Sequence, residues 1–169
     1  MSISKSRIDE LIAITRSTFG TIPRPRCTKR IGRALDDEWV VSEERGAELS
    51  ALDTERNWWD VSDEDLLEFS DILVWLSPEG FRFYYPAFLS YTLRHWNDVH
   101  DRVHLETFEA IGSQPHNLEM LTRDELNVVG ETITELTFDP KGANYEWVAT
   151  LTAVDTQFRR KPDRVPGSS

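Results

Sequence analysis

Two histidines four positions apart and a single cysteine are the side chains best suited to chemistry in this 169-residue chain. His100 and His104 enclose the sequence HDRVH, and on a helix this spacing places both imidazoles on one face. Zinc enzymes with an HExxH motif use the same spacing, but here Asp101 replaces the glutamate and no third ligand follows nearby. We therefore predict no metal and no cofactor, and interpret the histidines as half-exposed groups near a helix end.

Cys27 lies in the segment 24–33, RPRCTKRIGR, which holds five basic residues and no acid. Because neighbouring positive charge lowers the pKa of a thiol, this cysteine is expected to be more ionised than usual. A nucleophile also needs a base and an oxyanion site, and the sequence indicates neither. Signatures of serine hydrolases, P-loop proteins and dinucleotide-binding proteins are absent. An enzyme is therefore disfavoured, although one built from dispersed histidines and acids remains an alternative.

The charge balance is strongly acidic, with 30 acidic and 19 basic residues and a net charge of −11. This field repels a polyanion, so bulk binding of nucleic acid is disfavoured. The acids cluster over 36–48 and 62–68. They either occupy first turns of helices, where the helix dipole favours them, or form an acidic face for a basic partner. In the second cluster, Asp63, Glu64 and Asp65 are the candidate partner-facing residues.

Composition indicates a soluble protein with one globular domain over 1–160 and a flexible tail over 161–169. The longest apolar run, 72–76, is far too short to span a membrane. The N-terminus lacks the apolar core of a secretory signal, and a single cysteine excludes an internal disulfide. We therefore predict a cytoplasmic location. No feature of the sequence indicates an oligomeric state.

Apolar spacing predicts a mostly α-helical bundle. Helical periodicity is present over 6–19, from about 28, over 62–76, from about 86, over 122–136 and over 145–158. The second of these helices is expected to present to the core Ile31, Ala34, Leu35 and Trp39. The segment TITELTF, 132–138, permits a short strand, but the capping box of Thr122 and Glu125 leads directly into it and favours a helix.

The segment 75–96 contains 8 of the 18 aromatic residues. Ser77 and Pro78 are typical of a helix start. Pro86 lacks an N–H and crowds the preceding turn, so we predict a bend near 85–86 and a proline-bent pair of helices at the centre of the bundle. Most of these rings should be buried, since they are costly to expose.

Four aromatic residues and one arginine are candidates for binding. Arg82 lies within FRFYY and has two interpretations. It could pair with Glu79 or an acid of the preceding helix, or it could bind an anion at the mouth of an aromatic pocket. In the second case Tyr84 and Tyr85 would line the pocket. One of the neighbouring Trp58 and Trp59 should pack inward, and the other could contact a partner.

The residues Trp58-Trp59, Val61-Ser62 and the motif WLSPEGFRFYYPAFLSY at 75–91 resemble a family of small bacterial proteins of unknown function with a W…FLSPEAFRYYLPAYL-like core. The family's flanking helices correspond here to 6–19, a helix containing 33–36, and 123–137. Gly80 stands where alanine is more frequent, which loosens the first turn without removing it. The resemblance implies a helical fold and a bacterial source, and it implies no reaction.

Three classes of function are compatible with the sequence. A non-catalytic binding protein, of the immunity type that masks a basic partner, is favoured because complementary charge accelerates association. A small-molecule sensor that uses the aromatic bend as its pocket is the second. An enzyme with dispersed catalytic residues is the third.

Overall fold

The computed structural model describes residues 3–97, 101–113 and 115–137. These residues form seven α-helices and three short 3-10 helices, with no strand in the described part of the chain. The α-helices are α1 (Lys5–Phe19), α2 (Lys29–Glu38), α3 (Glu43–Leu52), α4 (Asp63–Glu68), α5 (Pro78–His95), α6 (Arg102–Ser113) and α7 (Arg123–Thr137). The 3-10 helices are η1 (Trp58–Asp60), η2 (Ile72–Val74) and η3 (Pro115–Met120). The predicted all-α fold is confirmed, whereas the helix predicted over 145–158 and the tail predicted over 161–169 lie outside the described residues.

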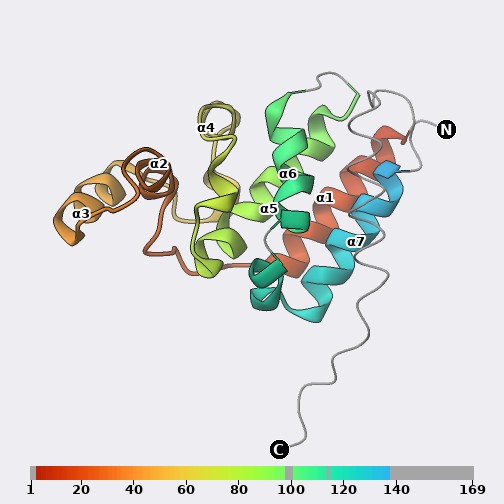
Figure 1. The fold of residues 1–169 in the computed structure, drawn as a ribbon. Helices are drawn as coiled ribbons and strands as arrows, with labels where there is room; N and C mark the ends of the chain where they lie inside the picture. Colours follow the sequence, from red (N-terminus) through yellow and green to blue (C-terminus); the bar gives the residue numbers. More distant parts are fainter. Residues whose placement is uncertain (1–2, 98–100, 114, 138–169) are drawn as a thin grey trace, which may run out of the picture.

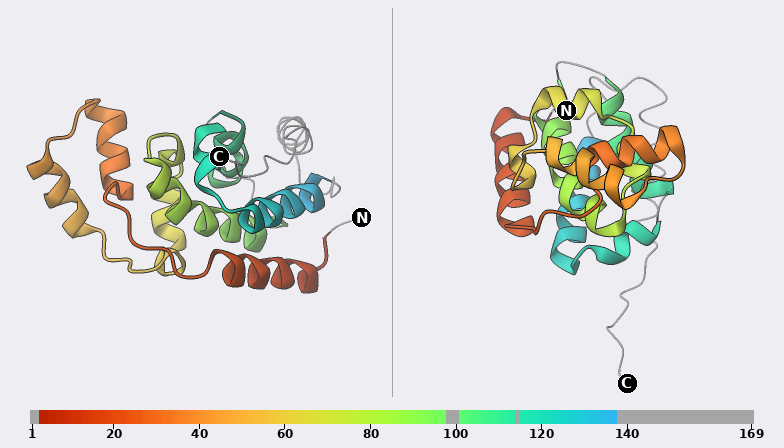
Figure 2. Two further views of the ribbon diagram at one scale, coloured as in Figure 1. Left: turned by 90° about the horizontal axis from the view of Figure 1, so that it is seen from below. Right: turned by 90° about the vertical axis from the view of Figure 1, so that its left-hand side faces the viewer.

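The helices form two unequal parts (Figure 1). Helices α1, α5, α6 and α7 pack together into a bundle, in which α5 contacts both α1 and α6, and α1 also lies against α7. Helices α2 and α3 pack on each other and project from one end of this bundle (Figure 2). We call residues 29–52, which comprise α2, α3 and their connection, the arm.

Helix α5 is the buried centre of the bundle. Ser77 caps it by accepting a hydrogen bond from the Gly80 N–H at 3.2 Å, and Pro78 is its first residue, as predicted. Its interior is buried on nearly every side, and its largest fully buried rings are those of Phe81, Phe83, Tyr84, Tyr85 and Phe88.

The predicted pair of helices at Pro86 is wrong, because α5 continues through this proline as one helix. A proline in a helix interior costs about 3 kcal/mol. Burying each of the surrounding aromatic rings contributes roughly 1.5–3 kcal/mol, so packing outweighs the lost backbone hydrogen bond.

Two other predicted elements differ from the structure. The single helix predicted over 62–76 is divided into α4 and η2. Arg33 of α2 explains the break, since its guanidinium donates to the Glu68 carbonyl at 2.9 Å and to the Asp71 carboxylate at 2.6 Å. The carbonyl at the end of α4 is thereby satisfied without a further helical turn. The strand considered for 132–138 is absent from its described part, because α7 extends to Thr137.

Candidate functional site

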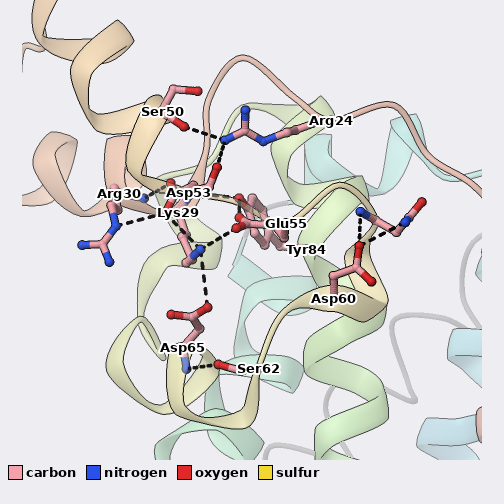
Figure 3. Close-up of polar contacts among 11 residues, drawn as sticks. Arg24, Lys29, Arg30, Ser50, Asp53, Glu55, Asp60, Ser62, Asp65 and Tyr84 are labelled. Atoms are coloured by element: carbon pink, nitrogen blue, oxygen red, sulfur yellow. Dashed lines mark hydrogen bonds and ion pairs between the residues drawn. The ribbon is translucent and has the colours of Figure 1, made fainter.

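A buried ionic cluster attaches the arm to the bundle (Figure 3). The Lys29 ammonium group at the start of α2 lies 3.0 Å from the Asp53 carboxylate and 2.8 Å from that of Glu55. All three side chains are at most 3% exposed. Asp65 of α4 lies farther away, at 3.6 Å, and is partly exposed. Burial of charge is costly, so the cluster is stable only because its members are paired.

Tyr84 connects this cluster to α5. Its hydroxyl donates to the Glu55 carboxylate at 2.5 Å and accepts the backbone N–H of Lys29 at 3.2 Å. Burial, together with the neighbouring Glu55, raises the pKa of the Tyr84 phenol. Burial alone would lower the pKa of Lys29, but its hydrogen bonds to Glu55 and Asp53 raise it above the ordinary value. The lysine therefore remains charged and the phenol neutral, and both hold the arm in place.

Two arginines complete the attachment around Asp53. Arg24 donates to the backbone carbonyls of Ser50 and Asp53 at 2.7 and 2.6 Å, which satisfies the C-terminal end of α3. The Arg30 guanidinium lies 3.1 Å from the Asp53 carboxylate, and the Arg30 backbone N–H donates to the same group. The start of α2 and the end of α3 are thus held at one point, as Figure 3 shows.

A groove of about 510 Å³ lies between α2, α3 and the start of α5. Its apolar lining consists of Ile31, Leu35, Val41, Trp75 and Leu76. Its remaining lining residues are Arg26, Cys27, Ser42, Glu43, Gly46 and Ser77. Because the ionic cluster fixes both helices of the arm, the groove is formed before anything binds.

Trp39 stands beside this groove with its indole in solvent. It ends α2 in the left-handed backbone region, at φ 61°, where residues other than glycine cost roughly 1–2 kcal/mol. Its ring packs edge-on against Trp75 at 6.0 Å, but the residue is 77% exposed and the adjacent Val40 is 78% exposed. The prediction that Trp39 faces the core is wrong, because the left-handed end of α2 directs the chain away from it.

The candidate aromatic residues of the sequence analysis are mostly buried. Trp58 is 2% exposed, and its indole N–H donates to the Gly20 carbonyl at 2.9 Å. Trp59 is partly buried, with the Arg16 guanidinium 4.0 Å above its ring. Tyr84 and Tyr85 are inside the bundle and have no exposed surface. These two tyrosines therefore line no opening to solvent.

Arg82 pairs with an acid that the sequence analysis did not consider. Its guanidinium donates to both carboxylate oxygens of Glu125 on α7, at 2.8–3.3 Å. The predicted partner, Glu79 or an acid of the preceding helix, is wrong. Glu125 is 43 positions away in the chain, and it comes near because α1 packs against both α5 and α7.

The three candidate acids at the start of α4 have different environments. Asp63 accepts hydrogen bonds from Arg94 and from His95, the latter at 2.9 Å. Burial opposes ionisation of Asp63, but His95 and Arg94 outweigh it and lower the pKa of its carboxyl group. Asp65 approaches Lys29, whereas Glu64 is exposed and makes no ion pair with any described residue. Glu64 alone of the three is thus available to a partner.

The side chains that could take part in catalysis or metal binding do not come together at an open site. The interpretation of His104 as half-exposed is wrong, because this residue is fully buried. It contacts Asp101 through Nδ1 at 2.8 Å, while the Tyr91 hydroxyl donates to the same carboxylate at 2.5 Å. His100 lies outside the described residues. Over 3–97, 101–113 and 115–137, no three His, Cys, Asp or Glu side chains are grouped to hold a metal; the absence of a metal stays a prediction.

Cys27 is half-buried, and burial raises the pKa of its thiol although a hydrogen bond from Ser77 opposes the rise. The predicted lowering is wrong because burial of the thiol disfavours its charged form. The thiolate that a nucleophile requires is therefore disfavoured.

Comparison with known proteins supports the resemblance. The model of a family of unknown function, DUF6714, matches residues 7–135. The chain belongs to this family. No curated protein and no solved structure matches it. None of the helices in the described ranges combines the length and the apolar character needed to cross a membrane.

Sequence reasoning missed the two features on which the arm depends. The pairing of Lys29 with Asp53 and Glu55 has no local signal, since the partners are more than 20 positions apart. Trp39 did have a signal: the apolar run Trp39-Val40-Val41 follows a polar helix end and precedes the helix cap Ser42. A short apolar run between two polar helix ends indicates an exposed patch as well as a core contact.

Proposed function

We propose that this protein is a non-catalytic, cytoplasmic interaction protein whose arm binds a basic protein partner. The exposure of Trp39 and Val40 beside a preformed apolar groove is the observation that carries the proposal. Tryptophan is among the residues that contribute most to binding in protein interfaces. Exposed apolar residues that cluster around a groove are typical of interaction sites.

Charge around the groove indicates the chemistry of the partner. Residues 36–48 contain six acids and one base, and Asp37, Glu38, Glu44 and Glu48 among them are exposed. A basic surface would be attracted to this rim, while its apolar residues would enter the groove. An immunity-type protein that masks a basic toxin is one form of this function.

The attachment of the arm favours tight binding. Lys29, Asp53 and Glu55 hold α2, and Arg24 holds the end of α3, so the groove keeps its shape without a partner. A preformed site loses little conformational entropy on binding. The partner therefore meets a rigid surface.

The test is capture of partners from the native host by the tagged wild-type chain and by a Trp39→Asn variant. Asparagine tolerates the left-handed backbone, so the variant keeps the end of α2 while it loses the indole. We expect a basic protein that is captured by the wild type to dissociate roughly 30-fold faster from the variant. Leu67→Gln, which removes an exposed apolar side chain of α4 outside the groove, is the matched control and should bind normally.

Salt dependence tests whether opposite charge drives the association. Attraction between charges is screened over about 8 Å at physiological ionic strength, so the association rate should fall as salt is added. Capture of the same proteins by wild type and Trp39→Asn, or an association rate that does not change with salt, would contradict the proposal.

A further inference from the structure

A second cavity, of about 370 Å³, lies in the bundle between α1, η1, α4 and α5. It shares no lining residue with the groove of the arm. We propose that it binds a small organic anion, a carboxylate with a flat apolar body. Its volume lies at the lower end of the range of about 300–1,000 Å³ that is typical of small-molecule sites.

The walls of the cavity are suited to an apolar body. Ile12 of α1, Trp58 of η1, Leu66 of α4 and Ala87 of α5 all line it. Trp58 is held in place by the hydrogen bond from its indole N–H to the Gly20 carbonyl. A flat ligand would therefore contact apolar side chains from four elements of the bundle, beside the polar groups that also line the cavity.

The charged groups of the cavity leave one positive charge in excess. Arg16, Arg94 and Asp63 all line it. Asp63 pairs with Arg94 and also accepts a hydrogen bond from His95, so its charge is already neutralised. Arg16 has no carboxylate of a described residue within ion-pair distance and lies against the Trp59 ring. An arginine without a carboxylate in a partly enclosed site favours an anionic ligand.

Asp60 of η1 is a further acid on which the charge of Arg16 acts. Arg16 contributes to the lowered pKa of Asp60, but the larger cause is hydrogen bonding of the Asp60 carboxylate by the backbone and side chain of Asn57. These bonds measure 2.9 and 3.0 Å. Asp60 is therefore already bound, and the guanidinium of Arg16 stays available.

Ser90 supplies an independent indication of a ligand. Ser90 lines the cavity, the residue is 3% exposed, and its buried hydroxyl oxygen has no hydrogen-bond partner among the described residues. A serine within a helix commonly bonds the carbonyl four residues earlier, and leaving a buried hydroxyl unpaired is costly. A carboxylate in the cavity would accept from this hydroxyl as well as from Arg16.

The experiment uses three ligands of equal shape and different charge: benzoate, benzamide and benzamidine. Binding is followed through the indole N–H signals of Trp58 and Trp59 in nuclear magnetic resonance spectra of the full chain. We expect benzoate to saturate these signals with a Kd on the order of millimolar or tighter. Benzamide should bind at least about tenfold more weakly, and benzamidine more weakly still, because each loses the charge-assisted bond to Arg16.

Two variants test the named residues. Arg16→Gln should weaken benzoate about tenfold or more, and Ser90→Ala about threefold to tenfold. Ser90→Ala should also raise the Tm by roughly 2–4 °C, since it removes an unpaired hydroxyl from a helix interior. Arg45→Gln, at a surface arginine of the arm, is the charge-matched control and should bind benzoate like the wild type.

Failure of benzoate to saturate the signals would overturn the proposal, as would equal binding of benzamide or normal binding by Arg16→Gln. Arg16 is on the surface of α1, so this variant should fold, and its melting curve verifies that any loss of binding is local. The proposal is independent of the arm, because Trp39→Asn should leave benzoate binding unchanged.

Discussion

Trp58 in the bundle is 2% exposed and its indole N–H is bonded, whereas Trp39 in the arm is 77% exposed and adopts an unfavourable backbone conformation. The same contrast extends to their surroundings. Helix α5 has apolar residues on all sides and buries them, while the groove between α2 and α3 leaves Ile31 and Leu35 only partly covered. The apolar side chains of the bundle are therefore covered by the chain itself, whereas some of those in the arm remain partly exposed.

This contrast separates residues that stabilise the fold from residues that are free for function. Apolar side chains contribute to stability in proportion to the area they remove from water, so Trp39 contributes little in the isolated chain. Four substitutions test this separation, from the largest expected loss of stability to the smallest.

Phe88→Ala should cause the largest loss, about 4 kcal/mol in the free energy of unfolding. The ring is fully buried at the centre of α5, and truncation of such residues removes apolar contacts and leaves a cavity. Urea denaturation of both proteins measures the difference. A loss below about 1 kcal/mol would mean that the bundle tolerates the cavity and that its aromatic centre is not what stabilises it.

Lys29→Met should destabilise the chain by about 3 kcal/mol, because it leaves the buried carboxylates of Asp53 and Glu55 without their cation. Lys5→Met is the matched control. Lys5 is 90% exposed and its ion pair with Asp9, at 3.7 Å, lies in solvent, so its loss should have almost no effect.

Hydrogen exchange locates the consequence of Lys29→Met. We expect the amides of α2 and α3 to lose protection more than those of α5, since the cluster attaches the arm. Uniform loss of protection over both parts would contradict a separate role for the cluster.

The sequence predicted the starts of several helices because their signals are local. Ser77 and Pro78 start α5, Thr28 precedes α2, and the capping box of Thr122 and Glu125 is confirmed in both directions. Each of these signals concerns residues within one turn.

The sequence failed where a distant contact decides the outcome. Helix α5 continues through Pro86 because neighbouring helices bury it, and Arg82 pairs with Glu125 because α5 and α7 both pack against α1. Of the candidate site, the acidic rim at 36–48 was predicted and the exposed Trp39 was not. A local sequence pattern does not predict whether other parts of the chain will bury an apolar residue at a helix end.

Acid should weaken the bundle partly through Asp63. The pKa of this carboxyl group is below its ordinary value of 3.8 in the folded chain, since Arg94 and His95 favour its charged form despite burial. The stability that Asp63 contributes is thus present above pH 3.8 and is lost as the pH falls through the lower folded value. Asp63→Asn should flatten this acid side of the plot of Tm against pH. Glu44→Gln is the control in the arm, because Glu44 makes no ion pair with a described residue, and an equal flattening there would contradict the assignment to Asp63.

Trp39→Asn should change the free energy of unfolding least, by no more than about 1 kcal/mol. The variant loses the edge-on contact with Trp75, and such aromatic pairs contribute about 0.5–1.5 kcal/mol. It gains relief of the left-handed backbone, which costs a tryptophan roughly 1–2 kcal/mol and asparagine less. The two effects are of similar size and opposite sign. Urea denaturation should therefore give nearly coincident curves for the two proteins, whereas Phe88→Ala shifts the curve strongly.

A loss of 2 kcal/mol or more would show that Trp39 stabilises the arm through Trp75. The contrast between a covered and an uncovered tryptophan would then be one of degree, and the loss of partner binding in this variant could no longer be assigned to the indole alone.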